Sequence, residues 1–199
     1  MPDSRDPDVS RETAPKYMAH NIRLTYDDYC RMPSGQRYQL IEGDLMMVPS
    51  PNVFHQEISG RIGDALRRWV QGRNLGRVYH APIDVVLGEH NVFQPDILYI
   101  SRERLGIIKK ANIQGAPDLV VEILSPSTAE VDRVTKRRVY ARYGVRELWV
   151  VDPEARSVEV AAHNGHELAT VQVYPLGTSL ESPLLPGLAL DIDELFLEE

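Results

Sequence analysis

A strand–helix–strand unit in the second half of the chain constrains the fold more than any other feature. An apolar run at 119–124 (LVVEIL) is followed by a basic segment with a helical pattern, and then by a second apolar run at 146–152 (RELWVVD). Two strands joined by a crossover helix lie parallel in one sheet. A strand with a continuous apolar run is covered on both faces. The unit therefore predicts an α/β fold in which helices cover a central sheet.

Cap and turn residues set the limits of the other expected elements. Ser127 and Glu130 have capping-box spacing at the start of the crossover helix, and Gly144 stands where that helix should stop. The segment GEHN predicts an antiparallel hairpin between its flanking strands. The further expected elements are a short helix in 24–33, a strand pair in 37–51 that bends at Gly43, a helix over 53–72, strands at 77–87 and 92–100, a hairpin that turns at Asn164-Gly165, and a closing strand and short helix.

These elements fit one domain over residues 21–199, with residues 1–20 as a flexible leader. The chain has 199 residues, enough for one good-sized core. No apolar run approaches the ~18 residues needed to span a bilayer. The single cysteine, Cys30, excludes disulfides and cysteine zinc sites, favours a cytoplasmic location, and is expected to pack as a small hydrophobe.

Glu122 interrupts the most apolar strand and needs a partner there. An unpaired charge inside a strand costs several kcal/mol, so the partner is a structural Arg or Lys, a metal ion, or water at a wet strand end. Asp118 points to the same face but lies about 13 Å away along the strand, too far to share an ion. Asp96, which follows Pro95 at the start of a neighbouring strand, is the better candidate.

Two further groups complete a possible cation site. Glu42 or Asp44, which flank Gly43, supplies a third carboxylate, and carboxylates that converge at a sheet edge bind hard divalent cations such as Mg²⁺. Lys136 lies in the helix that leaves the strand of Glu122, where its amine could orient an attacking water. The alternative for Lys136 is a simple helix pair with Asp132, worth only about 0.2–0.5 kcal/mol.

A net charge of −7 argues against nucleic-acid binding through bulk charge, but one stretch is strongly basic. Residues 133–146 hold six Arg and Lys residues and no acid, which fits either a solvated helix face or a phosphate-binding surface. His55, at the start of the helix over 53–72, either caps that helix or contacts a phosphate. No Gly-rich phosphate loop is present, which disfavours a nucleotide-binding domain.

Several motifs together resemble one known family. They are LIEGDL, PSPNVFHQ, QPDILYI, APDLVVEILSPST, DRVTKRRVYARYGVRELWVVDP and PLLPGL, and they extend over roughly residues 22–197. This combination resembles the Uma-two family of bacterial restriction endonucleases, a branch of the PD-(D/E)XK nuclease superfamily. The resemblance implies a restriction-endonuclease-like core, with a central mixed sheet flanked by helices, and Mg²⁺-dependent cleavage of DNA.

The resemblance also implies roles for individual residues. Asp96 and Glu122 match the two metal-binding acids, and Lys136 matches the amine that this family supplies from the following helix. The superfamily position two residues after the acid holds Leu124 instead of Lys. Many relatives have Glu where this chain has Gln39, so either Glu42 takes that place or the third acid is missing.

The sequence leaves two hypotheses from different classes. In the first, the chain is a Mg²⁺-dependent DNA endonuclease, with Mn²⁺ able to substitute, in which Glu42, Asp96, Glu122 and Lys136 are catalytic. His55, Arg133, Arg137 and Arg138 then contact the substrate, and a homodimer is expected because two-strand cleavage benefits from paired sites. In the second, a protein with the nuclease fold binds nucleic acid or a partner without cutting.

Overall fold

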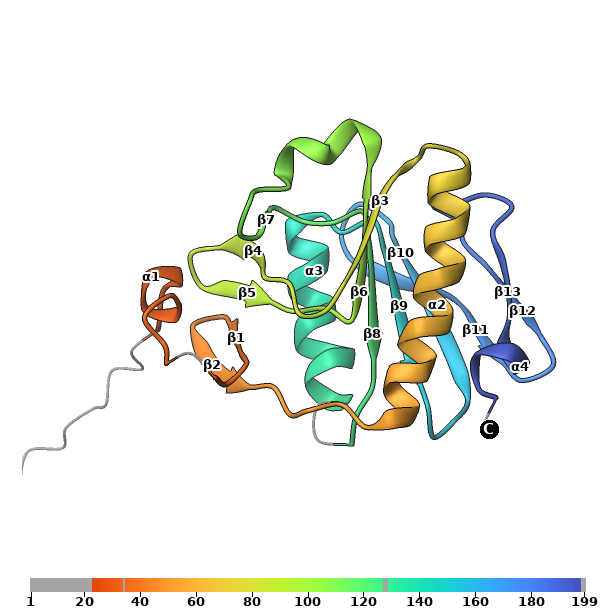
Figure 1. The fold of residues 1–199 in the computed structure, drawn as a ribbon, viewed down its shortest axis with the longest axis horizontal. Helices are drawn as coiled ribbons and strands as arrows, with labels where there is room; N and C mark the ends of the chain where they lie inside the picture. The colour runs from red at the N-terminus through yellow and green to blue at the C-terminus, as the bar shows by residue number, and fades with distance from the viewer. Residues whose placement is uncertain (1–22, 34, 127–128, 198–199) are drawn as a thin grey trace, which may run out of the picture.

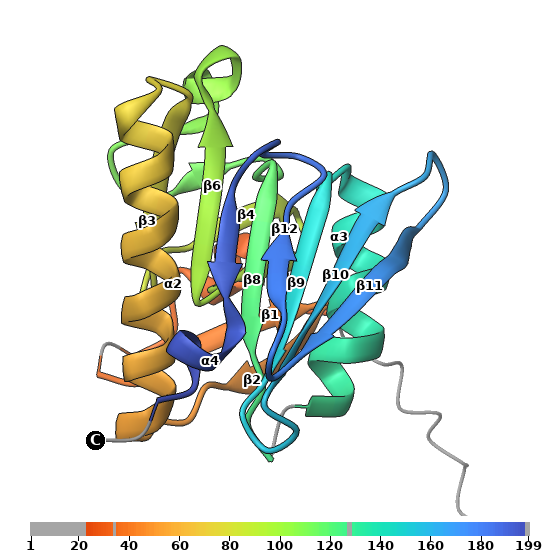
Figure 2. The same cartoon turned by 90° about the vertical axis from the view of Figure 1, so that its right-hand side faces the viewer.

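The structure, a computed structural model, describes residues 23–33, 35–126 and 129–197. The expected leader at 1–20 lies outside these residues. A six-stranded sheet forms the centre of the molecule, with a long helix on one face and a shorter helix on the other (Figures 1 and 2). This arrangement confirms the predicted α/β class with its central mixed sheet.

The parallel pair predicted from the strand–helix–strand unit forms the middle of this sheet. Strand β8 (Leu119–Ile123) runs parallel to β9 (Glu147–Asp152). All other pairs in the sheet are antiparallel, in the order β11-β10-β9-β8-β6-β3, where β3 is Gly76–His80 and β6 is Ile97–Ser101. Strands β10 (Ser157–His163) and β11 (Leu168–Pro175) form the hairpin expected at Asn164-Gly165.

Each of the two strands expected at 77–87 and 92–100 is divided between two sheets. The first becomes β3 and β4 (Val85–Gly88), and the second becomes β5 (Asn91–Phe93) and β6. The expected hairpin is present in both halves, since β4 pairs with β5 and β3 pairs with β6. Pro82 and Pro95 lie in the two breaks, where a missing N–H cannot extend a ladder.

A second sheet contains the halves of these strands that adjoin the turn, β4 and β5, and no sequence pattern predicted this sheet. Its order is β2-β1-β5-β4-β7, with β1 at Tyr38–Ile41, β2 at Asp44–Met47 and β7 at Ile113–Gln114. Gly43 turns the chain between β1 and β2, as expected, with a φ of +92°. A 3₁₀-helix, η1 (Arg102–Ile107), connects β6 to β7.

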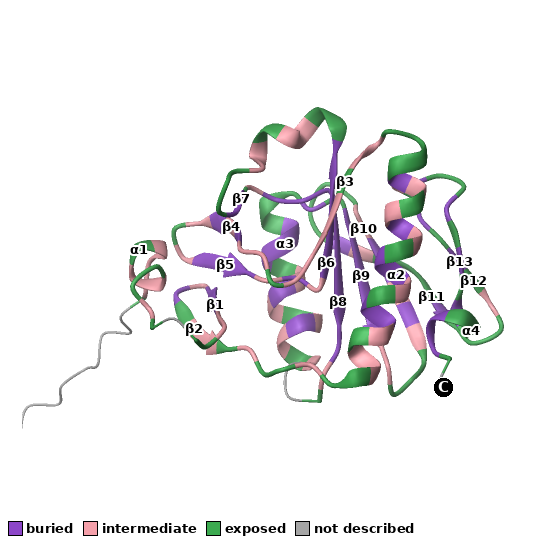
Figure 3. Cartoon of the chain, viewed as in Figure 1, coloured by how far each residue is buried: buried purple, intermediate pink, exposed green. Residues whose placement is uncertain are grey.

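Alternating side chains of the central strands fill two cores. Odd-numbered residues of β6 and β8, such as Ile97 and Val121, pack under α2 (Val53–Gly72) with the chain's C-terminal elements. Even-numbered residues, such as Leu98 and Val120, pack under α3 (Arg137–Tyr143). Burial is therefore continuous along the central strands (Figure 3). Glu122 is even-numbered and so points into the α3 side.

The crossover helix departs from a regular α-helix in its first half. Residues Val131–Lys136 form a π-helix, η2, which continues directly into α3. Gly144, with a φ of +85°, ends α3 as predicted. Ser127, the predicted cap, lies outside the described residues.

The short terminal elements follow their cap residues. Thr25 caps α1 (Tyr26–Tyr29) through a complete capping box, and the end of the chain forms β12 (Ser179–Glu181), β13 (Ala189–Asp191) and α4 (Ile192–Leu195). The expectation that Cys30 packs as a small hydrophobe is wrong, because its side chain is exposed at the end of α1. A helix of only four residues leaves its last position outside the core.

Gly76 allows β3 to approach β6 closely, and its replacement by Ala should be destabilising. A Cβ at Gly76 would lie 2.1 Å from the backbone oxygen of Ile100, and φ is +153°. We expect Gly76→Ala to lower the free energy of unfolding by roughly 1–3 kcal/mol or more. Gly60 in α2 is the control, since its Cβ would meet open space. Gly60→Ala should stabilise by about 0.5–1 kcal/mol, and urea denaturation that ranks the two variants the other way would contradict the prediction.

Candidate active site

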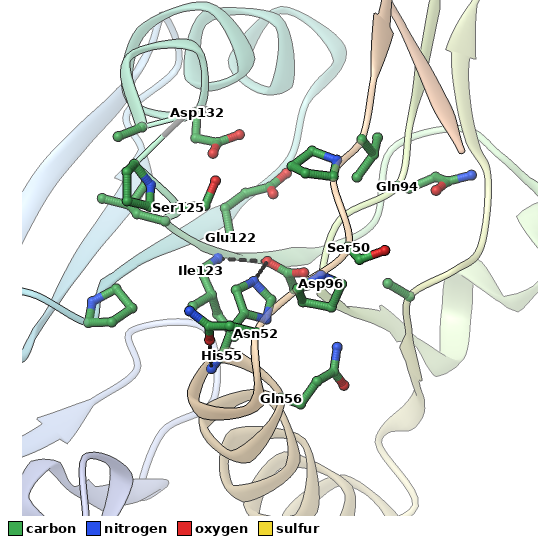
Figure 4. A pocket seen from close by; sticks show the side chains of 18 of the residues that line it. Ser50, Asn52, His55, Gln56, Gln94, Asp96, Glu122, Ile123, Ser125 and Asp132 are labelled. Atoms are coloured by element: carbon green, nitrogen blue, oxygen red, sulfur yellow. Dashed lines mark hydrogen bonds and ion pairs between the residues drawn. The ribbon is translucent and has the colours of Figure 1, made fainter. Parts of the chain in front are cut away.

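One cleft of 710 Å³ lies between the start of α2, the adjoining ends of β6 and β8, and the π-helix η2 (Figure 4). Among the site residues predicted from the sequence, five line this cleft: His55, Asp96, Glu122, Arg133 and Lys136. They come from elements separated by up to 81 positions, as between His55 and Lys136. The topology thus brings the expected acids, amine and imidazole to one place.

Asp96 stands directly before β6, at the mouth of the cleft. Continuing the register Ile97↔Val121 outward by one residue places Asp96 opposite Glu122. Its Oδ2 accepts a hydrogen bond from the Ile123 backbone N–H at 2.8 Å and lies 3.4 Å from His55 Nε2. Its side chain is 21% exposed, so a solute in the cleft can reach this carboxylate.

His55 is held in place by the start of α2. Asn52 caps this helix by accepting the His55 backbone N–H at 2.8 Å. Burial lowers the pKa of the imidazole, but the hydrogen bond and the charge of Asp96 outweigh burial and raise the pKa above its usual value. The imidazole of His55 therefore holds a proton more readily than a free histidine, beside the carboxylate of Asp96.

Glu122 is buried and has a partner on each oxygen. Oε1 accepts a hydrogen bond from the Tyr140 hydroxyl at 2.6 Å, and Oε2 lies 3.0 Å from Lys136 Nζ. Burial raises the pKa of Glu122 to about 8, although Lys136 acts in the opposite direction. The charge that interrupts the apolar strand is therefore balanced by an amine from the crossover helix.

Lys136 makes both interactions that the sequence offered as alternatives. Its Nζ lies 2.7 Å from Asp132 Oδ1, the helix pair, and 3.0 Å from Glu122 Oε2. Burial would lower the pKa of Lys136, but the two carboxylates outweigh burial and raise it. The ammonium is thus held fully charged at the floor of the cleft.

The donors in the cleft suit a hard divalent cation. Asp96 and Glu122 provide carboxylate oxygens, and the five Asp and Glu residues that line the cleft outnumber its three Arg and Lys residues, an excess of negative charge that a cation would offset. Within the described residues, no three His, Cys, Asp or Glu side chains form a group that could hold one metal ion. Two carboxylates still fit Mg²⁺, which keeps several waters and binds through one or two acids plus phosphate oxygens.

Three predicted residues are not brought to the cleft. Glu42 lies in the β1–β2 turn and forms ion pairs with Arg138 and, at 3.1 Å, with Arg142. Arg137 binds Glu159 of β10 at 2.6 Å. These ion pairs engage Glu42, Arg137 and Arg138 with the protein itself, away from the acids of the cleft.

Two residues from the segment before Glu42, Arg37 and Gln39, line the cleft and were not proposed as site residues. Gln39 in β1 is buried, and its Oε1 has no hydrogen-bond partner among the described residues. Arg37 lines the cleft as well, donates to the Pro49 carbonyl at 3.0 Å, and has no ion pair with a described residue. The family resemblance, in which many relatives have Glu at the position of Gln39, was the one sequence feature that pointed to this residue. Nothing in the sequence marked Arg37.

Asp118, excluded above as a partner for Glu122, has a structural environment. It is fully buried and accepts the Ser101 backbone N–H at 2.8 Å and Arg104 Nη1 at 3.1 Å. This cluster lies at the opposite end of β8 from Glu122. The local "PD" of residues 117–118 therefore belongs to the scaffold.

The fold and the cleft define the class of protein. A mixed sheet between helices, with Asp and Glu on adjacent strand ends and Lys on the next helix, is the restriction-endonuclease-like nuclease fold. A solved structure described as a "putative nuclease belonging to DUF820", from Anabaena variabilis ATCC 29413, is similar to this one. The TM-score is 0.74 at 22% identity, over 87% of this chain and 97% of the other.

The chain belongs to the Uma2 (Uma-two) family, whose model is described as "Putative restriction endonuclease" and matches residues 25–193. This match confirms the resemblance drawn from the sequence motifs. No curated protein matches the chain. In the described part of the chain, no helix is both long and apolar enough to cross a membrane.

Proposed function

We propose that this protein is a Mg²⁺-dependent endonuclease that hydrolyses phosphodiester bonds in DNA. The observation that carries the proposal is the pairing of Asp96 and Glu122 on adjacent strand ends, with the Lys136 ammonium 3.0 Å from Glu122 in the same cleft. Family membership and the similar structure support a nuclease. The excess of acids in the cleft supports a divalent cation.

The residues of the cleft have different roles in the proposed hydrolysis. Asp96 and Glu122 would hold Mg²⁺, which when bound supplies Lewis-acid stabilisation of the charge on the phosphate. Lys136 is placed to orient an attacking water and to offset negative charge that develops at phosphorus. The water oxygen bonds to phosphorus and gives up a proton to solvent, one P–O ester bond breaks, and the leaving oxygen takes up a proton from solvent. Ile123 N–H and His55 fix the orientation of Asp96.

A structure determined after a Mn²⁺ soak tests this proposal directly. One ion bound by both Asp96 and Glu122 is the expected result, with waters in its other positions. Binding of Mn²⁺ elsewhere, or by neither carboxylate, would contradict it. The soak does not depend on knowing the DNA sequence that the protein recognises.

The second hypothesis, binding of DNA without cleavage, has one observation in its favour. Gln39 occupies the place in the cleft where many relatives have Glu, so the described site holds an amide there. Incubation of supercoiled plasmid with the protein and Mg²⁺ separates the two functions. A nuclease converts the plasmid to nicked or linear forms and stops when EDTA is added, whereas a binding protein only retards the intact plasmid.

Arg37 and Arg133 are the arginines best placed to contact DNA phosphates. Both line the cleft, and Arg37 is free of acid partners among the described residues, while Arg133 lies 2.6 Å from Asp152. We expect Arg37→Ala to weaken DNA binding for all sequences alike and to reduce the slope of log affinity against log salt by about 1. Arg138→Ala is the control, since Arg138 lies outside the cleft. A salt slope unchanged in Arg37→Ala would argue against this contact.

The structure favours an antiparallel pairing of two copies along β11, and we propose a homodimer of this kind. Strand β11 lies at the edge of the central sheet, has no charged residue in Leu168–Pro175, and exposes Val171 and Val173. Uncharged edge strands are open to pairing, and antiparallel self-pairing about Gln172 would bring Val171 to Val173 of the second copy. We expect light scattering to show a dimer that Val173→Lys converts to monomer. A monomeric wild-type protein would contradict this assembly.

A further inference from the structure

Three residues spaced four apart on the crossover helix surround the buried carboxylate of Glu122. Asp132, Lys136 and Tyr140 are exposed by 2%, 4% and 0%. Lys136 and Tyr140 each contact one oxygen of Glu122, and Asp132 forms an ion pair with Lys136. The proposed function uses Glu122 and Lys136 and gives no role to the other two.

The π-helix explains why all three side chains face the sheet. In an α-helix, side chains four positions apart are turned by about 40° relative to each other, because 3.6 residues complete one turn. Over eight positions this turn would move Asp132 away from Tyr140. The wider turn of η2, with i→i+5 hydrogen bonds, reduces the rotation between Asp132 and Lys136. Irregular helices of this kind are frequent at functional sites.

The contacts of Lys136 present a difficulty for a metal-binding Glu122. An ammonium bound only to Glu122 would compete directly with a cation for this carboxylate. Here the ammonium is shared, at 2.7 Å from Asp132 and 3.0 Å from Glu122. Asp132 can therefore hold Lys136 in place while Glu122 also binds a cation.

Tyr140 fixes the orientation of the Glu122 carboxylate. Its hydroxyl donates to Oε1 at 2.6 Å, and its ring packs edge-on against Phe93 at 5.1 Å between centroids. The ring is fully buried and cannot move away. A carboxylate oxygen has two lone pairs, so Oε1 can accept this bond and still bind a cation.

We propose that Asp132 and Tyr140 are positioning residues for the cation site: Asp132 retains the Lys136 ammonium, and Tyr140 fixes the Glu122 carboxylate. This proposal rests on the proposed function, because it assumes that Glu122 binds a divalent cation. Asp132 is assigned to act through Lys136, because its carboxylate lies 2.7 Å from the Lys136 ammonium.

Calorimetric titration of the full chain with Mn²⁺ alone, without DNA, tests the proposal. We expect Asp132→Asn and Tyr140→Phe each to weaken Mn²⁺ binding by about 10–100-fold, as for other residues that orient metal ligands. Asp118→Asn and Tyr99→Phe are matched controls. Asp118 is an equally buried acid with arginine partners, and the Tyr99 hydroxyl donates to the Leu75 carbonyl at 3.0 Å, so neither change should alter Mn²⁺ affinity.

Two further measurements separate positioning from a loss of structure. Asp132→Glu keeps the charge and should recover part of the affinity that Asp132→Asn loses. In plasmid cleavage, both positioning variants should lower kcat and leave KM for DNA unchanged, because both side chains are buried.

The outcomes distinguish this proposal from the proposed function. Wild-type affinity in both Asp132→Asn and Tyr140→Phe would overturn the positioning roles while leaving the nuclease proposal intact. Equal losses in the matched controls would also overturn them, because a general loss of stability would then account for the effect. A wild-type protein that binds no Mn²⁺ at all would overturn both proposals.

Discussion

Asp96→Asn and Glu122→Gln should each reduce Mg²⁺-dependent plasmid nicking by about a thousandfold or more. A metal ion contributes several kcal/mol to stabilising the transition state, and each 1.36 kcal/mol corresponds to a factor of ten in rate. Both substitutions keep the shape of the side chain and remove one charged ligand. The initial rate of conversion of supercoiled to nicked plasmid at saturating Mg²⁺ measures the effect.

The two variants should remain folded, so that a loss of rate reports on chemistry. The Tyr140 hydroxyl donates to Glu122 Oε1 at 2.6 Å, and the amide oxygen of a glutamine can accept the same hydrogen bond. In Glu122→Gln, Lys136 retains Asp132 at 2.7 Å as its partner. Asp64→Asn, an exposed change on α2, is the control and should cleave at the wild-type rate. Nicking that persists in both Asp96→Asn and Glu122→Gln would indicate a contaminating nuclease and would contradict the assigned site.

Lys136→Met should destabilise the protein by roughly 3–5 kcal/mol near pH 8.5, the range for a buried ion pair that loses one partner. Methionine fills a similar volume but leaves Glu122 and Asp132 buried without their ammonium. Lys110→Met, an exposed change, is the control and should leave stability nearly unaltered. The midpoint of urea denaturation provides the comparison.

The loss in Lys136→Met should be smaller at pH 5. With Lys136 in place the pKa of Glu122 is about 8, and without the ammonium burial raises this pKa further, opposed only by the hydrogen bond from Tyr140. In both proteins the folded state holds the proton of Glu122 more tightly than the unfolded state, so stability falls as pH rises above about 4.5; this fall ends near pH 8 in the wild type and continues to higher pH in the variant. At pH 5 Glu122 is protonated in the folded variant, and only the pairing of Asp132 is lost. A penalty that is equal at pH 5 and pH 8.5 would show that Glu122 does not carry it.

Much of the scaffold could be predicted because its signals are local. The apolar runs of β8 and β9, with a capped helical segment between them, determined a parallel pair, and Gly144 determined where α3 ends. Pairing Asp96 with Glu122 needed only strand alternation and the placement of Pro95-Asp96 at the start of a neighbouring strand. The division of both hairpin strands between two sheets was missed, because Pro82 and Pro95 mark a break without saying where the chain goes next.

The third acid expected at the site, Glu42, could not be placed from local sequence patterns. Gln39 and Glu42 lie three residues apart, and in a strand such positions point to opposite faces. Once β1 directs Gln39 into the cleft, Glu42 cannot follow, and it lies in the turn beside Arg138 and Arg142. The sequence alone did not indicate whether Gln39 or Glu42 faces the cleft. Only the pairing of β1 with β5 chose between them.

The basic stretch of the crossover helix gives the same lesson for charge. Arg133 and Arg137 are the start of a basic run in the sequence, but acids from β9 and β10, Asp152 and Glu159, bind them in the fold. By itself, the sequence determined the α/β class, the parallel pair and the need of a buried Glu122 for a partner, because hydrophobic burial and desolvation act on each segment separately. The tertiary structure decided which charges meet, because ion pairs depend on distances of a few ångströms between elements far apart in the chain.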